Sequence, residues 1–475
     1  MALVVLGGAG RFIALELSPP GFYLDEAAGA TNITCISQTG ADAAGVPFPL
    51  FSRGLGGGFV TPAYLYFGAV WAKVFGFSVG SFRSIAAFFN VLTILGLYLL
   101  ARRLMNRDVA IYTVLAASMS PWSFQFSRIA WDPPLAPCFL IWAIYFLLRS
   151  DRAGDSAFAG FLLSLSMYSY PPARVQIPVL LLPLLWMRKV HGGLHLRPLL
   201  AFLGAGAMTA LPLIWLTLTG EFQERVQELT IFSKGYLEGP GGNSVGRVAI
   251  TFVHNMWLHF TPRYLFVSGD ANPRHSTQFV GELSWLDTFV LATGAIFVIA
   301  SGLRSRKSHG RDVEESMSFR QALAFALVGY VAGVVPAALT WESLPHALRS
   351  IGSWPFLSLL TGLMMWKITL RWKGFLVAAT AVTAAFAIAF SWFYFSEYPA
   401  RSRGFFDSQI KKAAEHGRLT GDWSHFAMAS RRYPALASVY YLIQYGGGTC
   451  TWWRERMLPG SGRYGSIPSP PALGR

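Results

Sequence analysis

Two neighbouring carboxylates near the N-terminus are the first residues in this sequence whose types could do chemistry. The stretch from Pro19 to Glu26 reads PPGFYLDE, so Asp25 and Glu26 follow an apolar run that two prolines interrupt. The aromatics Phe22 and Tyr23 are of the kind enriched at membrane–water boundaries. A carboxylate just beyond such a boundary is sufficiently hydrated to ionise, and it is close enough to act on a group held in the lipid. In the simpler interpretation, Asp25 only caps a short helix that begins at Glu26.

Arginines, histidines and further acids recur in the hydrophilic segments between apolar runs. Arg128 and Asp132 lie four residues apart, a spacing that allows an ion pair on one helical turn. His346 and Arg349 lie three residues apart, on one face of a helix. Taken singly, the arginines could anchor lipid headgroups, Asp132 could neutralise Arg128, and the histidines could be structural. Two further clusters are Tyr168, Tyr170 and Arg174 in YSYPPAR, and Asp270, Asn272, Arg274 and His275 in SGDANPRHS.

Taken together, these residue types match the needs of a transfer reaction with a phosphate leaving group. Negative charge grows on the phosphate as its bond breaks, and arginine forks and histidines can stabilise that charge. The attacking hydroxyl needs a carboxylate within hydrogen-bond reach to take its proton. The pattern therefore favours a reaction between a lipid-linked anion and an outer acceptor, with Asp25 as the base.

The composition predicts an all-α polytopic membrane protein. The 475 residues are 53% hydrophobic and only 13% charged, with a mean hydropathy of +0.41, too apolar for an ordinary soluble chain. The net charge of +15 is spread over short loops, which excludes a nucleic-acid-binding patch and is typical of topology signals. The cysteines Cys35, Cys138 and Cys450 have no metal-binding spacing, and the sequence leaves open whether Cys35 and Cys450 meet.

Apolar runs predict about 11 transmembrane helices. The run at 61–77 is assigned instead to a juxtamembrane helix in the first outer loop, with Lys73 snorkelling, because a crossing there would place Arg102 and Arg103 outside. The opening run is not assigned as a cleaved signal. The predicted spans are at about 1–18, 84–101, 109–121, 134–148, 157–170, 175–187, 198–218, 285–302, 321–340, 350–366 and 374–395.

The basic loops predict the orientation. Loops after every second span are rich in arginine and lysine, for example Arg102 with Arg103 and Arg304 with Arg306, and such loops stay in the cytoplasm. This places Asp25, Asp132, the 219–284 loop and everything after about 396 on the outer face. The predicted domains are a transmembrane domain at 1–395 and a small extracytoplasmic region at 396–475, disordered at its PSPPALGR end.

At this point the chain resembles the GT-C class of integral-membrane glycosyltransferases, in the branch with protein O-mannosyltransferases and aminoarabinose transferases of lipid A. The likeness covers about 1–370. It rests on Asp25–Glu26, on Arg128 with Asp132, on Tyr170 to Arg174, and on the segments GDANPRHS and PHALRSIG. The resemblance implies a polyprenyl-phosphate-linked sugar as donor, inverting transfer on the non-cytoplasmic side, and membrane lipid around the enzyme. The acceptor is a lipid, a glycan or a protein.

The resemblance also implies roles for individual residues. Asp25, Glu26 and Asp132 are the candidate catalytic acids, with Asp25 as the essential one. Some members of the class carry a divalent metal near these acids, but no His, Asp and Glu ligand set stands out in this sequence, so no metal site is assigned. The candidates for binding the donor phosphate are Arg128, Arg174, Arg274, His275, His346 and Arg349.

Three other functions compete with a glycosyltransferase. A transporter or flippase of lipid-linked sugars is expected to show inverted repeats and polar groups near the bilayer midplane, whereas the charged residues here lie at span ends. A polymerase or ligase with a pyrophosphate donor would have similar outer arginines, so donor chemistry must decide. A nucleotide-sugar enzyme is disfavoured because GGAGRF lacks the third glycine of the dinucleotide pattern.

Overall fold

The computed structural model describes residues 7–53, 59–219, 227–239, 244–301, 317–430 and Cys450. The start of predicted span 1, the basic loop with Arg304 and Arg306, and the closing PSPPALGR lie outside these residues. The described chain is mainly α-helical, as predicted, with one two-stranded antiparallel sheet. It divides into two compact units, unit 1 at 1–10, 89–126 and 133–391, and unit 2 at 11–88, 127–132 and 392–475.

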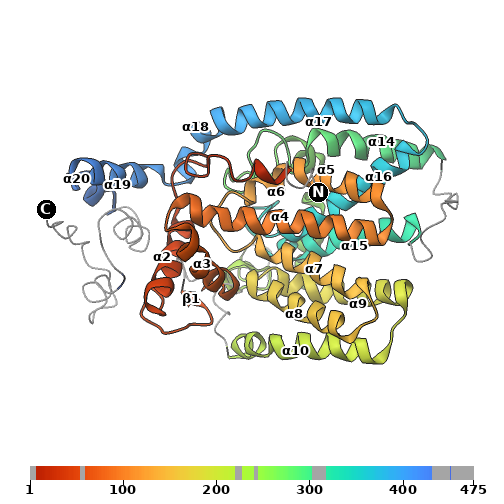
Figure 1. Cartoon of the computed structure of the whole chain (residues 1–475), viewed down its shortest axis with the longest axis horizontal. Helices are drawn as coiled ribbons and strands as arrows, with labels where there is room; N and C mark the ends of the chain where they lie inside the picture. Colours follow the sequence, from red (N-terminus) through yellow and green to blue (C-terminus); the bar gives the residue numbers. More distant parts are fainter. Residues whose placement is uncertain are drawn as a thin grey trace. The chain divides into compact units, whose positions relative to one another are not determined.

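Unit 1 holds most of the long apolar helices, which can be followed by their labels in Figure 1. Their positions agree with the predicted spans to within a few residues at most ends. Including the shorter helices, the elements of unit 1 are the second part of α4 (Val79–Leu104), α5 (Arg107–Met119), α6 (Pro121–Phe126), α7 (Leu135–Arg149), α8 (Ala153–Ser169), α9 (Ala173–Gly192), α10 (Leu196–Leu218), α12 (Lys234–Leu237), α13 (Val245–Leu258), η1 (Arg263–Val267), α14 (Trp285–Ser301), α15 (Phe319–Ala338), η2 (Ile351–Ser353), α16 (Trp354–Thr369) and α17 (Phe375–Trp392).

Small residues allow these helices to approach closely. A Cβ atom added at Gly160 of α8 would lie 2.1 Å from the carbonyl oxygen of Phe202 in α10, so only glycine fits there. In the same helix pair the hydroxyl of Ser164 donates to the carbonyl of Gly206 at 2.7 Å. This combination of glycine contact and interhelical hydrogen bond is typical of helices that pack within a bilayer. A second core, with Leu286, Phe375 and Ile368 at its centre, joins α14, α17 and α16.

Four described helices are long and apolar enough to cross a membrane: Val79–Leu104, Leu196–Leu218, Phe319–Ala338 and Phe375–Phe405. The shorter apolar helices Leu135–Arg149 and Trp285–Ile296 coincide with two further predicted spans. Helix α10 exposes large apolar side chains, among them Met208 at 70% and Trp215 at 68%, as a lipid-facing helix would. The number of about 11 spans stays a prediction.

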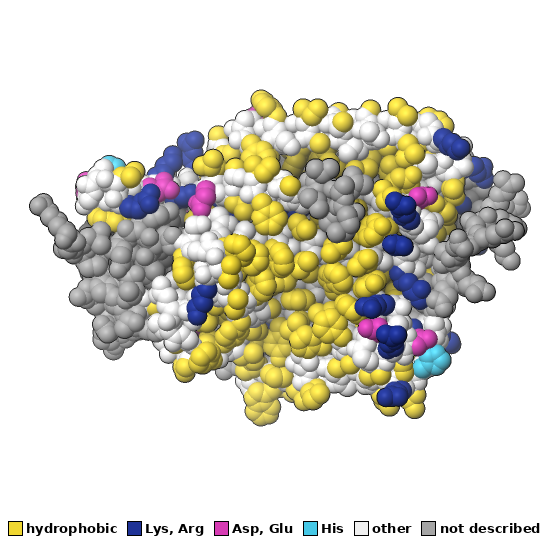
Figure 2. All heavy atoms as spheres, viewed as in Figure 1, with side chains coloured by type: hydrophobic (Ala, Val, Ile, Leu, Met, Phe, Trp, Pro, Cys, Tyr) yellow, Lys and Arg dark blue, Asp and Glu magenta, His cyan; other side chains and the backbone are white. Residues whose placement is uncertain are grey.

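A group of exposed basic residues of unit 1 lies at one end of its helices. Figure 2 shows exposed hydrophobic side chains between the helix ends and lysine and arginine side chains gathered where α7 and α9 end and α8 and α10 begin. Arg149, Arg152, Lys189 and Arg197 are the exposed basic residues at those helix ends. One basic end is what the positive-inside pattern predicts, although the side of the membrane on which it lies stays a prediction.

Unit 2 is built from short helices and the small sheet. In the sheet Ser52 pairs with Val60 and Arg53 with Phe59. A disulfide joins Cys35 to Cys450, which answers the question that the sequence left open. The elements are α2 (Leu24–Thr39), β1 (Ser52–Arg53), β2 (Phe59–Val60), α3 (Pro62–Phe75), the first turns of α4, η3 (Phe393–Glu397), α18 (Tyr398–Ser402), η4 (Arg403–Phe405), α19 (Ser408–Thr420) and α20 (Ser424–Ser430).

Helix α3 is the helix predicted for the run at 61–77. It begins with Pro62 at its first turn, where a proline costs no hydrogen bond, and it ends before Gly76. Val70 and Val74 are exposed on its surface, and Lys73 is exposed beside them. An exposed apolar face with a lysine is compatible with the predicted place at the membrane boundary.

Candidate active site

The segment before the acidic pair wraps around two buried arginines of unit 2. Residues 10–17 form turns, so the helix predicted for span 1 is wrong over this stretch. The reason is that carbonyl groups which would continue a helix point at guanidinium groups instead. Arg128 donates to the carbonyl oxygens of Arg11, Ile13 and Ser18, and Arg83 donates to those of Leu15, Pro19 and Gly21, at 2.6–3.0 Å.

Glu26 and Arg83 form a fully buried ion pair. Nε of Arg83 lies 2.9 Å from Oε1 of Glu26, and Nη2 lies 3.0 Å from Oε2, which is the bidentate geometry that stabilises such pairs. The same carboxylate accepts the backbone amides of Ala130 and Tyr23. Both oxygens of Glu26 are therefore engaged inside the protein. The structure gives Glu26, predicted as a catalytic acid, the position of an anchor that ties α2 to α4 and to the 127–132 segment.

Asp25 differs from its neighbour Glu26 in its exposure to solvent and in its hydrogen bonds. It is exposed on the first turn of α2, and its Oδ2 accepts a 2.8 Å hydrogen bond from the hydroxyl of Tyr23. It is not the helix cap, because α2 begins at Leu24, one residue before it. The amide of Tyr23 is satisfied by Glu26 and that of Leu24 by Asp407. The simpler interpretation of Asp25 as a cap is therefore wrong.

The aromatics beside Asp25 support it from within unit 2. Phe22 and Tyr23 are buried inside unit 2, at 0% and 2% exposure. The reason is aromatic packing: Tyr23 meets Trp131 edge to face at 5.8 Å and Phe406 at 6.1 Å. The hydroxyl that holds Asp25 therefore belongs to a ring that is fixed on two sides.

Asp132 is the second acid of this site. It lies in a segment of bends and turns after α6, so the helical turn predicted for Arg128 and Asp132 is not formed. Burial raises the pKa of Asp132 to about 7, partly opposed by hydrogen bonds from Thr61, and the negative charge of Asp25 acts in the same direction as burial. The charge of Asp25 therefore makes Asp132 hold its proton more tightly.

Arg128 lies inside unit 2. Its side chain is fully buried, and its guanidinium stands 5.2 Å from the ring centroids of both Tyr394 and Phe395 in addition to its carbonyl contacts. Such cation–π contacts stabilise a buried guanidinium. The structure thus shows Arg128 holding the loop before the acids, whereas its predicted contact with a donor phosphate stays a prediction.

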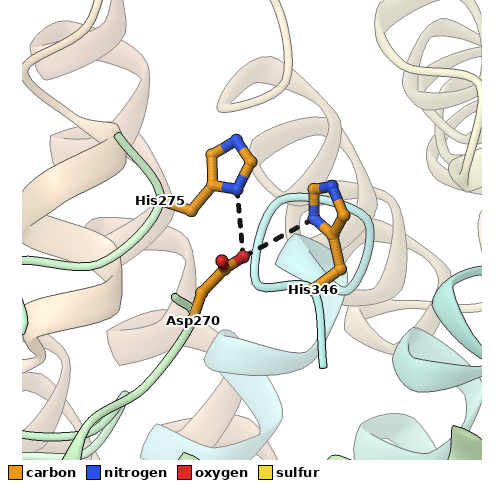
Figure 3. Close-up of side chains that lie close together, drawn as sticks. All are labelled: Asp270, His275 and His346. Carbon is orange, nitrogen blue, oxygen red and sulfur yellow. Dashed lines mark hydrogen bonds and ion pairs between the residues drawn. The ribbon is translucent and has the colours of Figure 1, made fainter. Parts of the chain in front are cut away.

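A different cluster in unit 1 brings together Asp270, His275 and His346. Figure 3 shows the two imidazole rings on one side of the Asp270 carboxylate, with both Nδ1 atoms turned toward the same oxygen. Nδ1 of His275 lies 3.0 Å from Oδ2 of Asp270, and Nδ1 of His346 lies 3.7 Å from it. All three side chains are buried, and the two rings stack at 4.6 Å between centroids.

The backbone around this cluster fixes the carboxylate. Oδ2 of Asp270 accepts the amide of Ala347 at 2.8 Å, and Oδ1 accepts the amide of Asn272 at 2.8 Å. The amide of Asp270 itself donates to Glu282, whose pKa burial raises well above its usual value. The sequence motif GDANPRHS thus folds into a turn around Asp270 that points His275 back at it.

A third histidine supports His346. His259 donates from Nδ1 to the carbonyl of Asn255 at 2.8 Å and accepts the amide of His346 on Nε2 at 3.0 Å. Both ring nitrogens are then satisfied in the neutral form, and burial lowers the pKa of His259 to about 4. Burial, together with His275 and Arg349, also holds the pKa of His346 well below its usual value.

The remaining predicted arginines of unit 1 are half-buried at turns. Arg174 follows the Pro171–Pro172 turn between α8 and α9, as predicted, and its Nε donates to the carbonyl of Met167 at 3.2 Å. Arg349 lies in a turn, not on the predicted helical face, and its guanidinium contacts Thr340 and Glu342. Arg274 directs its Nε toward Asn272 at 3.5 Å.

The roles of Arg83 and His259 could not be predicted from the sequence. Arg83 immediately precedes the apolar run at 84–101, where an arginine is expected to be a boundary residue, and His259 is a lone histidine in the 219–284 loop. His275 and His346 were predicted as candidate phosphate ligands, but the contact of His346 with Asp270 joins residues 76 positions apart, and spacing cannot reveal such a contact.

The chain matches one protein-family model and several solved structures. Residues 60–215 match a family model described as dolichyl-phosphate-mannose-protein mannosyltransferase. ArnT from Cupriavidus metallidurans matches in its apo state with 15% identity and a TM-score of 0.51, covering 95% of this chain and 76% of that one. The same protein bound to undecaprenyl phosphate matches with 14% identity, a TM-score of 0.50 and the same coverage.

A third match is more distant. The archaeal oligosaccharyltransferase AglB from Archaeoglobus fulgidus, in complex with an inhibitory peptide and a dolichol-phosphate, matches with 13% identity and a TM-score of 0.45, covering 91% of this chain and 59% of that one. No curated protein matches the sequence at a significant level. The resemblance to the GT-C class is confirmed, and the apolar helices together with the ArnT-like fold make this chain a multi-pass membrane protein.

Proposed function

We propose, for a chain with the fold of a GT-C glycosyltransferase, that it transfers a sugar from a polyprenyl-phosphate-linked donor to an acceptor hydroxyl at the outer face of the membrane. The observation that carries the proposal is the exposed Asp25 carboxylate, held at the start of α2 by Tyr23 and flanked by the buried anchor Glu26. A fixed, exposed carboxylate is the group that a general base requires.

Asp25 acts as the base in this reaction. Its carboxylate takes the proton of the acceptor hydroxyl while the hydroxyl oxygen attacks the anomeric carbon of the sugar. The bond between that carbon and the phosphate oxygen breaks, and its electron pair leaves with the lipid phosphate. Attack from the side opposite the phosphate inverts the anomeric centre. Asp132, whose pKa lies near 7, lowers or raises the negative charge around Asp25 as it binds or releases its own proton.

Arginines and histidines of unit 1 are proposed to bind a lipid phosphate. Arg174, Arg274 and Arg349 carry the planar fork that binds phosphate with paired N–H groups, and His275 and His346 are the predicted additional ligands. Support for a lipid phosphate as ligand comes from the matched ArnT structure, which is bound to undecaprenyl phosphate. The acceptor hydroxyl belongs to a lipid, a glycan or a protein.

The disulfide of unit 2 supports an active site outside the cytoplasm. Cys35 and Cys450 lie in the two segments predicted to be external, and disulfides persist in oxidising compartments. We therefore expect a reporter fused after residue 395 to be active only on the non-cytoplasmic side. The matching fusion after Arg152, in a predicted cytoplasmic loop, should give the opposite result. Activity of the first fusion in the cytoplasm would reverse the orientation.

The role of Asp25 is tested by Asp25→Asn, which keeps the shape of the side chain and removes the base. Turnover of a panel of polyprenyl-phosphate sugars, measured as release of lipid phosphate, should fall by about 10²–10⁴-fold. Asp422→Asn, at another exposed aspartate of unit 2, is the matched control and should keep wild-type turnover. A stable Asp25→Asn protein with near-normal turnover would remove the base assignment.

The same measurement separates an enzyme from a transporter of lipid-linked sugars. A transporter moves the donor across a vesicle membrane and leaves the sugar–phosphate bond intact. If the wild-type protein moves intact donor and releases no lipid phosphate with any sugar of the panel, the proposed transfer reaction is wrong.

A further inference from the structure

We propose that Asp270, His275 and His346 form a binding site for a divalent transition metal of the zinc type. The proposal concerns unit 1 alone and is independent of the role given to Asp25. All three side chains are at least nine-tenths buried, with exposed fractions of 4%, 10% and 8%. One ligand atom of each lies within 4.8 Å of the others, so a single ion could contact all three after small side-chain adjustments.

The distances between the ligand atoms suit a small cation. In a tetrahedral zinc site with bonds of about 2.0–2.1 Å, neighbouring ligand atoms are separated by about 3.3–3.5 Å. Here Oδ2 of Asp270 lies 3.0 Å from Nδ1 of His275 and 3.7 Å from Nδ1 of His346, values on either side of that separation. Figure 3 shows that both imidazoles approach the oxygen from one side, as ligands around a shared ion do.

The contact between His346 and Asp270 points more directly to a cation. The backbone amide of Arg349 points at Nδ1 of His346 from 3.4 Å, which assigns a lone pair, not a proton, to that nitrogen. A lone pair on Nδ1 then faces a carboxylate oxygen at 3.7 Å, two acceptors turned toward each other. A positive ion between the two would turn this repulsion into coordination.

The surroundings have the second layer of hydrogen bonds that metal sites require. The amides of Ala347 and Asn272 hold the two oxygens of Asp270, and His259 holds the backbone of His346. On the remaining side His275 stacks on Phe126, and the side-chain amide of Gln125 holds the carbonyl of Arg274 next to it. These contacts fix the ligand atoms before an ion arrives.

Two imidazoles and one carboxylate favour zinc over magnesium or calcium, which prefer oxygen ligands. Three protein ligands leave a fourth position for water or for an anionic oxygen. The described chain contains another set with the same ligand types, His416, Asp422 and His425, whose residues are all exposed. That exposed set supplies a matched control, because its histidines can be removed in the same way.

The experiment measures zinc in the full chain, purified in detergent through a tag without histidines. The protein is incubated with Zn²⁺, desalted and analysed by elemental mass spectrometry. The wild-type protein and His416→Ala/His425→Ala should retain stoichiometric zinc, whereas His275→Ala and His346→Ala should lose it. A wild-type protein without zinc, or zinc that is lost only from the exposed-set variant, overturns the proposal.

A second measurement does not depend on the folding of the buried-site variants. Co²⁺ bound to nitrogen and oxygen ligands in tetrahedral geometry gives a characteristic visible absorption. We expect this absorption in His416→Ala/His425→Ala after incubation with Co²⁺, and we expect added Zn²⁺ to remove it by competition. If this variant shows no cobalt absorption, the cluster is a hydrogen-bonded Asp–His group only and the proposal is wrong.

Discussion

Two buried carboxylates, Glu26 in unit 2 and Asp270 in unit 1, are compensated by different partners. Glu26 meets the permanent charge of Arg83 in a bidentate pair and accepts two backbone amides as well. Asp270 also accepts two backbone amides, but its side-chain partners are the imidazoles of His275 and His346, whose charge is variable. The first arrangement is a permanent anchor, whereas the second can respond to a proton or a metal ion.

This difference is consistent with the proposal that Asp25, and not Glu26, acts as the base. Because Arg83 and the two amides fully engage Glu26, the neighbouring residue can be exposed without disturbing the start of α2. In unit 1 the carboxylate itself remains the centre of the cluster. A substitution that breaks the pair at Glu26 should therefore lower the stability of the protein more than one that breaks the contacts of Asp270.

The largest effect is expected from Arg83→Met. It leaves the Glu26 carboxylate buried without its cation, and breaking a buried pair in this way costs about 3–5 kcal/mol of stability. Glu26→Gln should cost less, because Arg83 keeps the carbonyls of Leu15, Pro19 and Gly21. Thermal unfolding in detergent measures both.

Asp270→Asn in unit 1 completes this comparison. We expect a smaller loss of thermal stability than for Arg83→Met, because imidazoles carry no permanent charge that the substitution would leave without a partner. An equal or larger loss for Asp270→Asn would mean that the partners of Asp270 carry a fixed charge, and the contrast between the two carboxylates would disappear.

A smaller, pH-dependent effect is expected at Asp132. Its pKa in the folded protein, about 7, lies above the ordinary aspartate value of about 3.9, so the folded state binds the proton more tightly than the unfolded state. The stabilisation is complete below about pH 4 and is lost as the pH rises through about 7. The melting temperature of Asp132→Asn should depend less on pH than that of the wild-type protein over this range. Parallel curves for the two proteins would contradict the raised pKa.

The sequence predicted the helices of this fold well, because apolar runs of sufficient length leave few alternatives. Runs such as 198–218 and 374–395 correspond closely to α10 and α17. The prediction was wrong where distant side chains decide the backbone. The 10–17 segment is apolar enough to be a helix, but its carbonyls bind Arg83 and Arg128, which lie in remote parts of the chain.

The candidate site was predictable to a similar extent. The types of Asp25, Asp132, His275 and His346 were sufficient to identify them as candidates, because proton transfer and phosphate binding use carboxylates and imidazoles. Their partners were not predictable, because the pairing of Glu26 with Arg83 and of Asp270 with His346 depends on tertiary contacts across 57 and 76 residues.

The smallest effect is expected from Tyr23→Phe, which tests whether the exposed acid of unit 2 needs positioning. The variant keeps the ring packed against Trp131 and Phe406 and removes only the hydroxyl that donates to Asp25. A hydrogen bond to a charged group contributes about 1.5–3 kcal/mol, and exposure to water brings the expected value to the lower end. We therefore expect kcat to fall by about tenfold while KM and the melting temperature stay close to wild type.

Tyr66→Phe is the matched control for this change, because it removes a hydroxyl of unit 2 that donates to the carbonyl of Pro49. It should leave kcat unchanged and lower the melting temperature slightly. A structural role for Tyr23 would give the same pattern as the control, with lowered stability and unchanged kcat. Only the reverse pattern, in which kcat falls and stability is kept, assigns Tyr23 as the residue that positions the base. That result would also show that the exposed carboxylate of unit 2 works from a fixed position.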